Sequence, residues 1–500
     1  MKPGDKEQSY GHILKYTGIF GGVQGLNILI SLVRNKIVAS LLGPNGMGLV
    51  SLFNSTVNFI SQATNLGISF SAVRHVSELF DQGDEAQIQH FVKVVRAWSL
   101  LTGLVGMLVC VAAGPLLSRY TFSWGDHTLH FVLLSFAVGL LAVTGGESAI
   151  LKGARRLKAL ALIQFANVLM ALLIAVPIYY FFGESGIVPV IVLTAFSAML
   201  TTLYMSYRLY PLHLRGCKGI LGEGMGMVRL GVAYVLAGIL GSGAEMLIRA
   251  HLNVAGELDV VGFYNAGFIL TVTYAGMVFS AMESDYFPRL SAVTHDGAEQ
   301  ISNVVNKQIE VSFLLVSPML AVFILLLPVL LPLLTRADFM PAVPMAQVAS
   351  FSMYLRALSL PMSFMVLAKG DSLAYLFIEG FDSVLMFFLV VLGFRYYGLV
   401  GTGLALDASY LIDLIIIYIY TNRRYGYRFS LPLVQMVLVQ LPLGLCVYLL
   451  SFLDHSWLGV ALGYMLAFVS IIFSLIILHQ KTSLWQSLKQ RLQSKFRHHE

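Results

Sequence analysis

The chain has 500 residues, 57% of them hydrophobic and 12% charged, and a formal net charge of +6 at pH 7. This composition, with a mean hydropathy of +0.78, excludes a soluble globular protein. Because basic residues of membrane proteins follow topology and meet anionic lipid, the positive charge does not indicate nucleic-acid binding.

Apolar segments of about 20 residues, the length that crosses a bilayer as a helix, recur along nearly the whole chain. We therefore predict an all-α polytopic membrane protein. Fourteen spans are expected: 13–33, 49–72, 97–117, 129–150, 159–182, 186–206, 231–253, 262–286, 311–333, 343–367, 373–394, 398–420, 431–452 and 457–478. The segments 49–72 and 262–286 differ from the others because they are rich in Asn, Ser and Gly.

The distribution of basic residues tests this topology. If the amino terminus is cytoplasmic, most of the 32 Lys and Arg residues fall on the cytoplasmic side. Those expected on the outer side are Lys36, Arg119, Arg336 and Arg395. The positive-inside rule then places both termini in the cytoplasm. The first apolar segment lacks a small-residue cleavage site, so we expect a retained helix and not a cleaved signal.

The sequence contains an internal repeat. Gly48 precedes Arg74 by 26 positions and Gly262 precedes Arg289 by 27, and each Arg is followed seven positions later by an Asp. Further along, Leu151-Lys152-Gly153 matches Ala368-Lys369-Gly370, and Gly183-x-x-Gly186 matches Gly398-x-x-Gly401. Six spans per copy is an even number, so both copies enter the membrane in the same direction and form parallel lobes facing a central cavity.

The repeat defines the expected domains. We predict an N-lobe at 1–215, a C-lobe at 216–428, two additional spans within 429–480 and a basic cytoplasmic tail at 481–500. The tail resembles an amphipathic helix that lies on the cytoplasmic leaflet, with Trp485, Leu488, Leu492 and Phe496 on one face. A regulatory or partner-binding role for it is the alternative.

Three arginines in or beside the spans are candidate ligands for an anionic substrate: Arg34, Arg249 and Arg356. A guanidinium binds phosphate oxygens in a bidentate manner, and charges inside spans tend to mark cavities or ion paths. Each also has a structural interpretation. Arg34 could extend to the outer interface, Arg249 could form an intrahelical ion pair with Glu245 four residues earlier, and Arg356 could make an interhelical contact.

Acidic residues are concentrated in the second copy. Glu379 and Asp382 share a helix face, and with Asp407 on the next span they could form a site for H⁺ or Na⁺; Glu245 is a further candidate for ion coupling. Asp413, six residues after Asp407, is expected to face elsewhere. Carboxylates neutralised by hydrogen bonds within the lobe are the competing interpretation. No catalytic constellation, metal-ligand spacing or cofactor motif is evident, and the three cysteines predict no disulfide.

The duplication, the loop Leu41-Leu42-Gly43-Pro44-Asn45-Gly46-Met47-Gly48 and the segment Val261-Gly262-Phe263-Tyr264-Asn265-Ala266 resemble the polysaccharide flippases. These are the O-antigen and related lipid-linked oligosaccharide translocases of the multidrug/oligosaccharidyl-lipid/polysaccharide exporter superfamily. The resemblance implies a transporter, not an enzyme, in the bacterial inner membrane. It implies movement of undecaprenyl-diphosphate-linked glycan to the periplasmic leaflet for lipopolysaccharide biosynthesis, with a glycan polymerase and a chain-length regulator as partner proteins.

The same resemblance bears on individual residues. Val33-Arg34-Asn35-Lys36-Ile37-Val38 is similar to the end of the first helix in peptidoglycan-precursor flippases, where an arginine is functional. Ser61-Gln62 and Tyr264-Asn265-Ala266-Gly267 lack arginines of that family, which disfavours a peptidoglycan-precursor flippase. An ion-coupled multidrug/cation antiporter of the same superfamily is the main alternative, although it would normally stop at twelve helices. A non-transporting scaffold disagrees with the buried charges, and a membrane polymerase or acyltransferase would need a sizeable polar loop.

Overall fold

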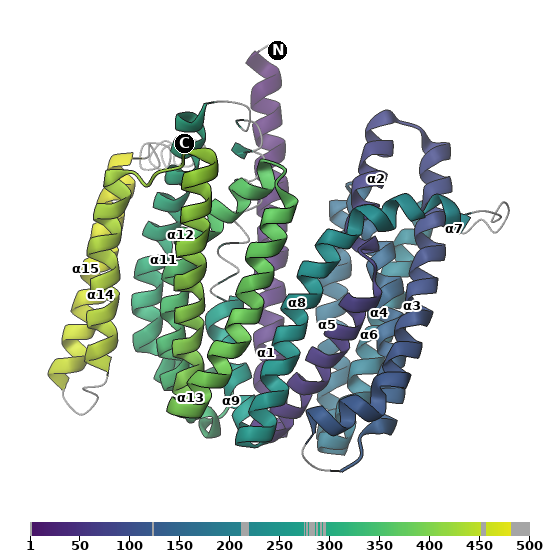
Figure 1. Cartoon of the computed structure of the whole chain (residues 1–500), viewed down its shortest axis with the longest axis horizontal. Helices are drawn as coiled ribbons and strands as arrows, with labels where there is room; N and C mark the ends of the chain where they lie inside the picture. The colour runs from purple at the N-terminus through teal and green to yellow at the C-terminus, as the bar shows by residue number, and fades with distance from the viewer. Residues whose placement is uncertain are drawn as a thin grey trace, which may run out of the picture. The chain divides into compact units, whose positions relative to one another are not determined.

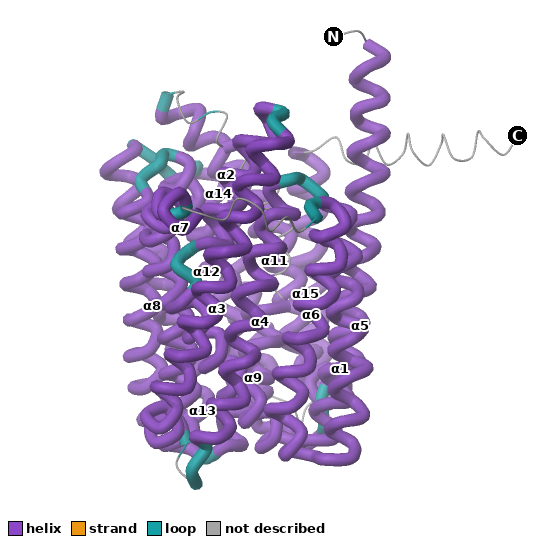
Figure 2. Tube along the Cα trace, turned by 90° about the vertical axis from the view of Figure 1, so that its right-hand side faces the viewer, coloured by secondary structure: helices purple, strands orange, loops and turns teal. Residues whose placement is uncertain are grey.

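A computed structural model describes residues 3–122, 125–211, 220–274, 297–451 and 457–481, and within 275–296 only Gly276, Phe279, Tyr286, Arg289, Leu290 and Val293. For residues 3–25 and 226–234 it describes the backbone alone. Nearly all described residues are helical, and no strand occurs among them (Figure 2). The predicted all-α membrane class is confirmed. The predicted amphipathic tail lies outside the described residues.

The helices follow the order shown in Figure 1. The longer ones are α1 (Pro3–Thr64), α2 (Ile68–Gln82), α3 (Glu85–Thr121), α4 (Thr128–Gly153), α5 (Leu157–Phe182), α6 (Ile187–Leu209), α8 (Met225–Gly256), α9 (Leu258–Phe268), α11 (Ala298–Leu334), α12 (Val343–Ala368), α13 (Ser372–Tyr425), α14 (Leu431–Ser451) and α15 (Trp457–Lys481). Shorter elements are η1 (Gly183–Gly186), α7 (Ile220–Glu223), η2 (Ile269–Tyr274) and η3 (Ala337–Ala342).

Ten helical stretches of the described residues are long and apolar enough to cross a membrane. Three of them overlap two predicted spans each, and in each the helix is interrupted at a glycine: Gly43 (φ 65°), Gly183 (φ 54°) and Gly398 (φ 58°). A positive φ suits glycine because it has no Cβ to clash with the backbone. The shorter apolar helix Leu258–Thr273 overlaps the first half of the predicted span 262–286. The count of fourteen spans stays a prediction.

The chain forms two compact units. The first comprises Met1–Asn265 and Pro332–Phe339, and the second comprises Ala266–Leu331 and Met340–Glu500. Buried aliphatic residues of α2, α3 and α4, such as Val76, Val95 and Ile150, pack together in the first unit. Phe313, Tyr354 and Ile417 belong to the core of the second. The predicted lobe boundaries at 215/216 and 428/429 stay predictions.

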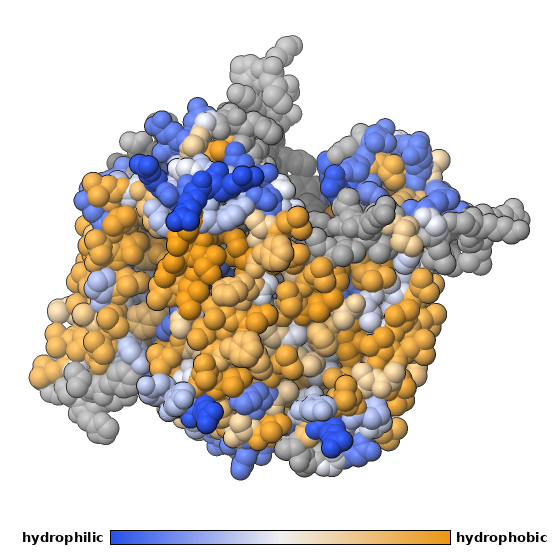
Figure 3. Space-filling model, in the orientation of Figure 1, coloured by the Kyte–Doolittle hydropathy of each residue, from blue (hydrophilic) through white to orange (hydrophobic). Residues whose placement is uncertain are grey.

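The exposed surface is that of an integral membrane protein. In Figure 3 apolar residues cover the flanks of the helices, and hydrophilic residues gather toward the helix ends. On α3, for example, Leu100, Leu104 and Leu108 are 58%, 59% and 70% exposed. Apolar side chains exposed at this density are stable only in contact with lipid or another apolar surface.

A buried ion pair holds α3, α4 and the end of α6 together in the first unit. Arg96 Nε lies 2.7 Å from Glu147 Oε1, and both side chains are less than one-tenth exposed. Arg96 Nη2 donates to the carbonyl oxygen of Tyr210 (2.9 Å), and the Ser206 hydroxyl donates to Glu147 (2.5 Å). The guanidinium also lies 4.2 Å from the centroid of the Tyr207 ring. Glu147, a charge inside a predicted span, is therefore a structural residue here.

The second unit holds the equivalent connection through Asn306 and Glu310 of α11. α11 corresponds to α3 in the repeat, and its Asn306 donates from Nδ2 to the carbonyl oxygen of Arg428 (2.9 Å). The Tyr427 hydroxyl donates to Asn306 Oδ1 (2.8 Å), and the Ser430 hydroxyl donates to Glu310 (3.1 Å). Both copies thus hold the segment after their sixth predicted span, the first around the Arg96–Glu147 ion pair and the second around the Asn306 amide and the Glu310 carboxylate.

Replacing Glu147 by Ala would leave the Arg96 guanidinium buried without its counter-charge. We expect this change to lower the free energy of unfolding by about 3–5 kcal/mol. The matched control is Arg74→Ala, which removes an exposed ion pair with Glu78 and should leave the free energy of unfolding nearly unchanged. Unfolding of the detergent-purified variants measures both, and equal losses in the two would contradict the assignment.

Candidate functional site

The two glycines that mark the sequence repeat lie against each other in the first unit. A Cβ built on Gly48 of α1 would lie 2.2 Å from the carbonyl oxygen of Leu258. A Cβ built on Gly262 of α9 would lie 2.1 Å from the carbonyl oxygen of Pro44. Since non-bonded carbon and oxygen atoms do not approach this closely, any larger residue at either position must displace a backbone. Equivalent residues of the two copies therefore form a reciprocal backbone contact.

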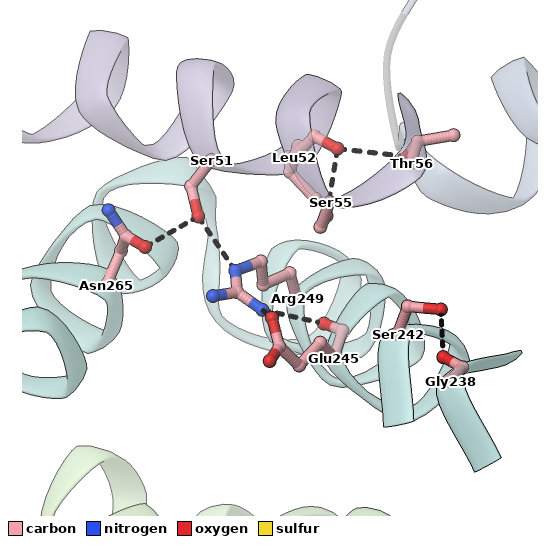
Figure 4. A network of polar contacts seen from close by, with 9 residues as sticks. All are labelled: Ser51, Leu52, Ser55, Thr56, Gly238, Ser242, Glu245, Arg249 and Asn265. Carbon is pink, nitrogen blue, oxygen red and sulfur yellow. Dashed lines mark hydrogen bonds and ion pairs between the residues drawn. The ribbon is translucent and has the colours of Figure 1, made fainter. Parts of the chain in front are cut away.

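Beside this contact a polar network joins α1, α8 and α9 (Figure 4). Arg249 donates from Nε to the Ser51 hydroxyl (2.8 Å), and that hydroxyl donates to Asn265 Oδ1 (2.9 Å). Arg249 Nη1 lies 3.2 Å from Glu245 Oε2 and 3.1 Å from the Glu245 carbonyl oxygen. Arg249 is only 6% exposed, so its guanidinium needs these acceptors to remain buried. The network connects the first copy of the repeat with the start of the second.

The expected intrahelical pair between Glu245 and Arg249 is present. Its two members differ in accessibility, because the Glu245 side chain is 47% exposed and that of Arg249 is 8% exposed. The arginine of the pair is thus buried, whereas its carboxylate is accessible. A role for Arg249 in anion binding and for Glu245 in ion coupling stays a prediction.

Near the break in α1, Arg34 and Lys36 have different surroundings. Arg34 is partly buried and donates from Nη2 to Asn35 Oδ1 (3.3 Å). Lys36 donates to the carbonyl oxygens of Pro332 (2.8 Å) and Thr335 (2.5 Å), where α11 ends. The last carbonyls of a helix lack intrahelical donors and carry partial negative charge, so Lys36 caps that helix. Lys36 is a structural residue, whereas the predicted substrate-binding role of Arg34 stays open.

The second unit brings Arg356 of α12 next to the two halves of α13. Arg356 Nη1 donates to the Tyr410 hydroxyl (2.7 Å), and the Ser409 hydroxyl donates to Asp382 Oδ1 (2.6 Å). Electrostatic interactions connect Glu379 with Arg356, Asp382 and Asp413. Ser359 forms a hydrogen bond with Asp413. We call Arg356, Glu379, Asp382 and Asp413 the acidic cluster.

Asp407 does not belong to the acidic cluster. The Ser352 backbone forms a hydrogen bond with it, and it interacts electrostatically with Tyr448 of α14. Its buried Oδ1 has no hydrogen-bond partner among the described residues. The structure therefore groups Asp413, and not the expected Asp407, with Glu379 and Asp382. In the described parts of the chain, no three His, Cys, Asp or Glu side chains are arranged to hold a metal ion.

The comparisons with known proteins identify the family. No curated protein matches the chain. The family model of polysaccharide biosynthesis proteins matches residues 13–294. The chain belongs to the polysaccharide biosynthesis protein family. This confirms the predicted resemblance at the level of the family.

Solved structures of transporters share the fold. An inward-facing multidrug resistance MATE transporter of the MOP superfamily superposes with a TM-score of 0.68 at 17% identity, covering 80% of this chain and 94% of that one. The lipid II flippase MurJ in an inward closed conformation gives 0.70 at 11% identity, covering 93% and 99%. A MOP superfamily transporter from Pyrococcus furiosus gives 0.59 at 16% identity, covering 82% and 93%. These likenesses show the fold of the chain, that of a polytopic helical membrane protein.

Sequence reasoning missed the neutral partners in these networks. Ser51 and Asn265 lie in the two segments that were least apolar, and that polarity was their only signal. Gly48 and Gly262 were recognised as markers of the repeat, yet their mutual contact was not expected. Asp413 was set aside because only its offset from Asp407 was considered, although it shares a helix face with Ser409 four residues earlier.

Gly48→Ala and Gly262→Ala should each lower the free energy of unfolding by about 1–3 kcal/mol, because either methyl group overlaps a backbone carbonyl. Since both enlarge one contact, the double variant should lose less than the two single losses combined. Thermal unfolding of the wild type, the two single variants and the double variant measures this coupling. Gly222→Ala is the matched control, since nothing lies within 4 Å of its built Cβ. Additive losses, or losses no larger than that of the control, would contradict the reciprocal contact.

Proposed function

We propose that the protein is a flippase that moves undecaprenyl-diphosphate-linked oligosaccharide from the cytoplasmic to the periplasmic leaflet by alternating access. The observation that carries the proposal is the membership of a polysaccharide biosynthesis family in a chain with a transporter fold. A glycan and its diphosphate cannot cross the hydrocarbon core unaided, because each buried polar group would lose its hydrogen bonds to water. A protein of this family that spans the membrane can provide the polar surface for that crossing.

The proposed ligands of the diphosphate are Arg34 and Arg249, with Arg356 as the third candidate. Arg249 is held in place by the Ser51 hydroxyl and the Glu245 carboxylate, so its position is fixed before substrate arrives. Arg34 contacts the neutral Asn35 amide. Arg356 lies among carboxylates, which compensate its charge and make it the weaker of the three as a phosphate ligand.

The acidic cluster is the proposed ion-coupling site for H⁺ or Na⁺, with Asp407 and Glu245 as separate candidates. Three carboxylates close together repel one another when all are ionised, so binding a proton or a cation there is favourable. Ion binding would change the charge balance around Arg356, which donates to Tyr410 and interacts electrostatically with Asp382. No cofactor is required by this scheme. The proposed location is a bacterial inner membrane, with both termini in the cytoplasm. The proposed partner proteins are a glycan polymerase and a chain-length regulator.

An ion-coupled antiporter of drugs or cations is the second candidate. The fold is shared with multidrug resistance MATE transporters, and the acidic cluster could bind a cationic substrate as well as a coupling ion. The two functions differ in the substrate that crosses the membrane.

Proteoliposomes containing a fluorescent undecaprenyl-diphosphate sugar test the proposal directly. We expect the wild type to flip the lipid, and Arg34→Ala and Arg249→Ala to lower the rate by about tenfold or more, because each removes a charge-assisted hydrogen bond. Arg74→Ala, which alters only an exposed ion pair, is the control and should flip normally. Asp382→Asn should abolish any dependence of the rate on a pH or Na⁺ gradient.

Three results would contradict parts of the proposal. Normal flipping by Arg34→Ala and Arg249→Ala would exclude these residues as phosphate ligands. A rate independent of both gradients in the wild type would remove the coupling role of the acidic cluster. Uptake of a cationic dye without any flipping of the glycan lipid would favour the antiporter.

A further inference from the structure

The second half of α1, after the break at Gly43, exposes only side-chain amides. Between Gly46 and Asn65 the exposed residues are Asn54, Asn58 and Gln62, and every other residue there is buried or partly buried. A spacing of four residues places these three side chains on one face of the helix. We call Asn54, Asn58 and Gln62 the amide face.

The amide face contrasts with the exposed face of a neighbouring span. Leu100, Leu104 and Leu108 of α3 have the same spacing, and each is more than half exposed. That leucine face suits lipid. An amide without a hydrogen-bond partner is unfavourable in hydrocarbon, so the amide face requires a polar occupant.

The amides are available to such an occupant. Other polar residues of this helix half already donate hydrogen bonds within the protein: Ser51, Ser55, Thr56 and Thr64. Asn54, Asn58 and Gln62, by contrast, form no hydrogen bond with any residue that the structure describes. Each amide offers two N–H donors and one carbonyl acceptor, so the face presents donors and acceptors together without net charge.

The polar surface continues onto α8. A Cβ built on Gly238 would lie 3.4 Å from Gln62 Oε1, so the absence of a side chain there leaves the Gln62 amide uncovered. Ser242 and Glu245 follow on the same helix; Figure 4 shows Glu245 beside the Ser51–Arg249 contact and Ser242 hydrogen-bonded to the Gly238 carbonyl oxygen. Phe59 of α1 lies at the border, 3.1 Å from a Cβ built on Gly243. Neutral amides, an aromatic edge and a half-exposed carboxylate thus occur on neighbouring parts of α1 and α8, and the carboxylate is paired with the buried Arg249.

We infer that the amide face binds the hydroxyl groups of the sugar that the lipid-linked substrate carries, an inference that rests on the proposed flippase function. Sugar hydroxyls both donate and accept hydrogen bonds, as the amides do. An anion would favour guanidinium groups, and a cation would favour carboxylates, neither of which the three positions supply. The amide face therefore recognises the glycan, whereas the arginines bind the diphosphate.

Binding of two probes tests the inference. The probes are undecaprenyl diphosphate carrying N-acetylglucosamine and bare undecaprenyl diphosphate, measured on protein in lipid nanodiscs. We expect the triple variant Asn54→Leu/Asn58→Leu/Gln62→Leu to bind the sugar-bearing probe about tenfold more weakly or worse, because several hydrogen bonds are lost. Its affinity for the bare lipid should stay within about twofold, which also shows that the variant is folded. The matched control, Gln164→Leu, replaces an exposed amide of α5 and should bind both probes normally.

The outcomes separate this inference from the proposed function. Unchanged binding of the sugar-bearing probe by the triple variant overturns the inference, as does an equal loss for both probes, while the flippase function stands. A wild type that binds both probes equally shows that the sugar is not recognised and also overturns it. A wild type that binds neither probe overturns the proposed function, and the inference with it.

Discussion

The backbone contact between Gly48 and Gly262 is the constraint on which the rest of the first unit depends. Each glycine leaves room for a carbonyl oxygen of the other segment, at a distance that a Cβ would occupy. With α1 and α9 this close, Ser51, one turn after Gly48, can bridge Asn265 of α9 and Arg249 of α8. A buried guanidinium is tolerated only where such acceptors converge. The candidate phosphate ligand Arg249 therefore depends on two glycines that never touch it.

Comparison of the two copies shows which features the duplication kept and which diverged. Both copies interrupt a helical hairpin at an equivalent glycine, Gly183 and Gly398, because the turn needs a positive φ. Both also anchor the segment after their sixth predicted span. The first uses a buried ion pair centred on Arg96, and the second uses the neutral Asn306. The second unit instead carries the acidic cluster, whose carboxyl groups are the proposed ion-coupling site.

Periodicity and spacing predicted what depends on local sequence, namely the helices, the repeat and the pair between Glu245 and Arg249. They could not predict contacts that depend on the rotation of one helix against another. Asp407 and Asp413 illustrate this, because spacing shows that they face different directions but not which of them faces Glu379. Lys36 was one of four basic residues expected on the outer side, and nothing local indicates that it caps a helix ending about 300 residues later.

The proposed division, in which arginines bind the diphosphate and amides bind the glycan, has a physical reason in transport. A carrier must bind its substrate strongly enough to capture it and weakly enough to release it. Charged groups suit the diphosphate, which is common to all substrates of such a lipid carrier, and few of them suffice because charge-assisted hydrogen bonds are about twice as strong as neutral ones. A glycan offers many neutral hydroxyls, each of which can exchange an amide partner for water at little net change in free energy. In the proposed transport, the uncharged amide face could therefore bind a sugar and release it again. A row of arginines or carboxylates at Asn54, Asn58 and Gln62 would bind charged groups too strongly for such release.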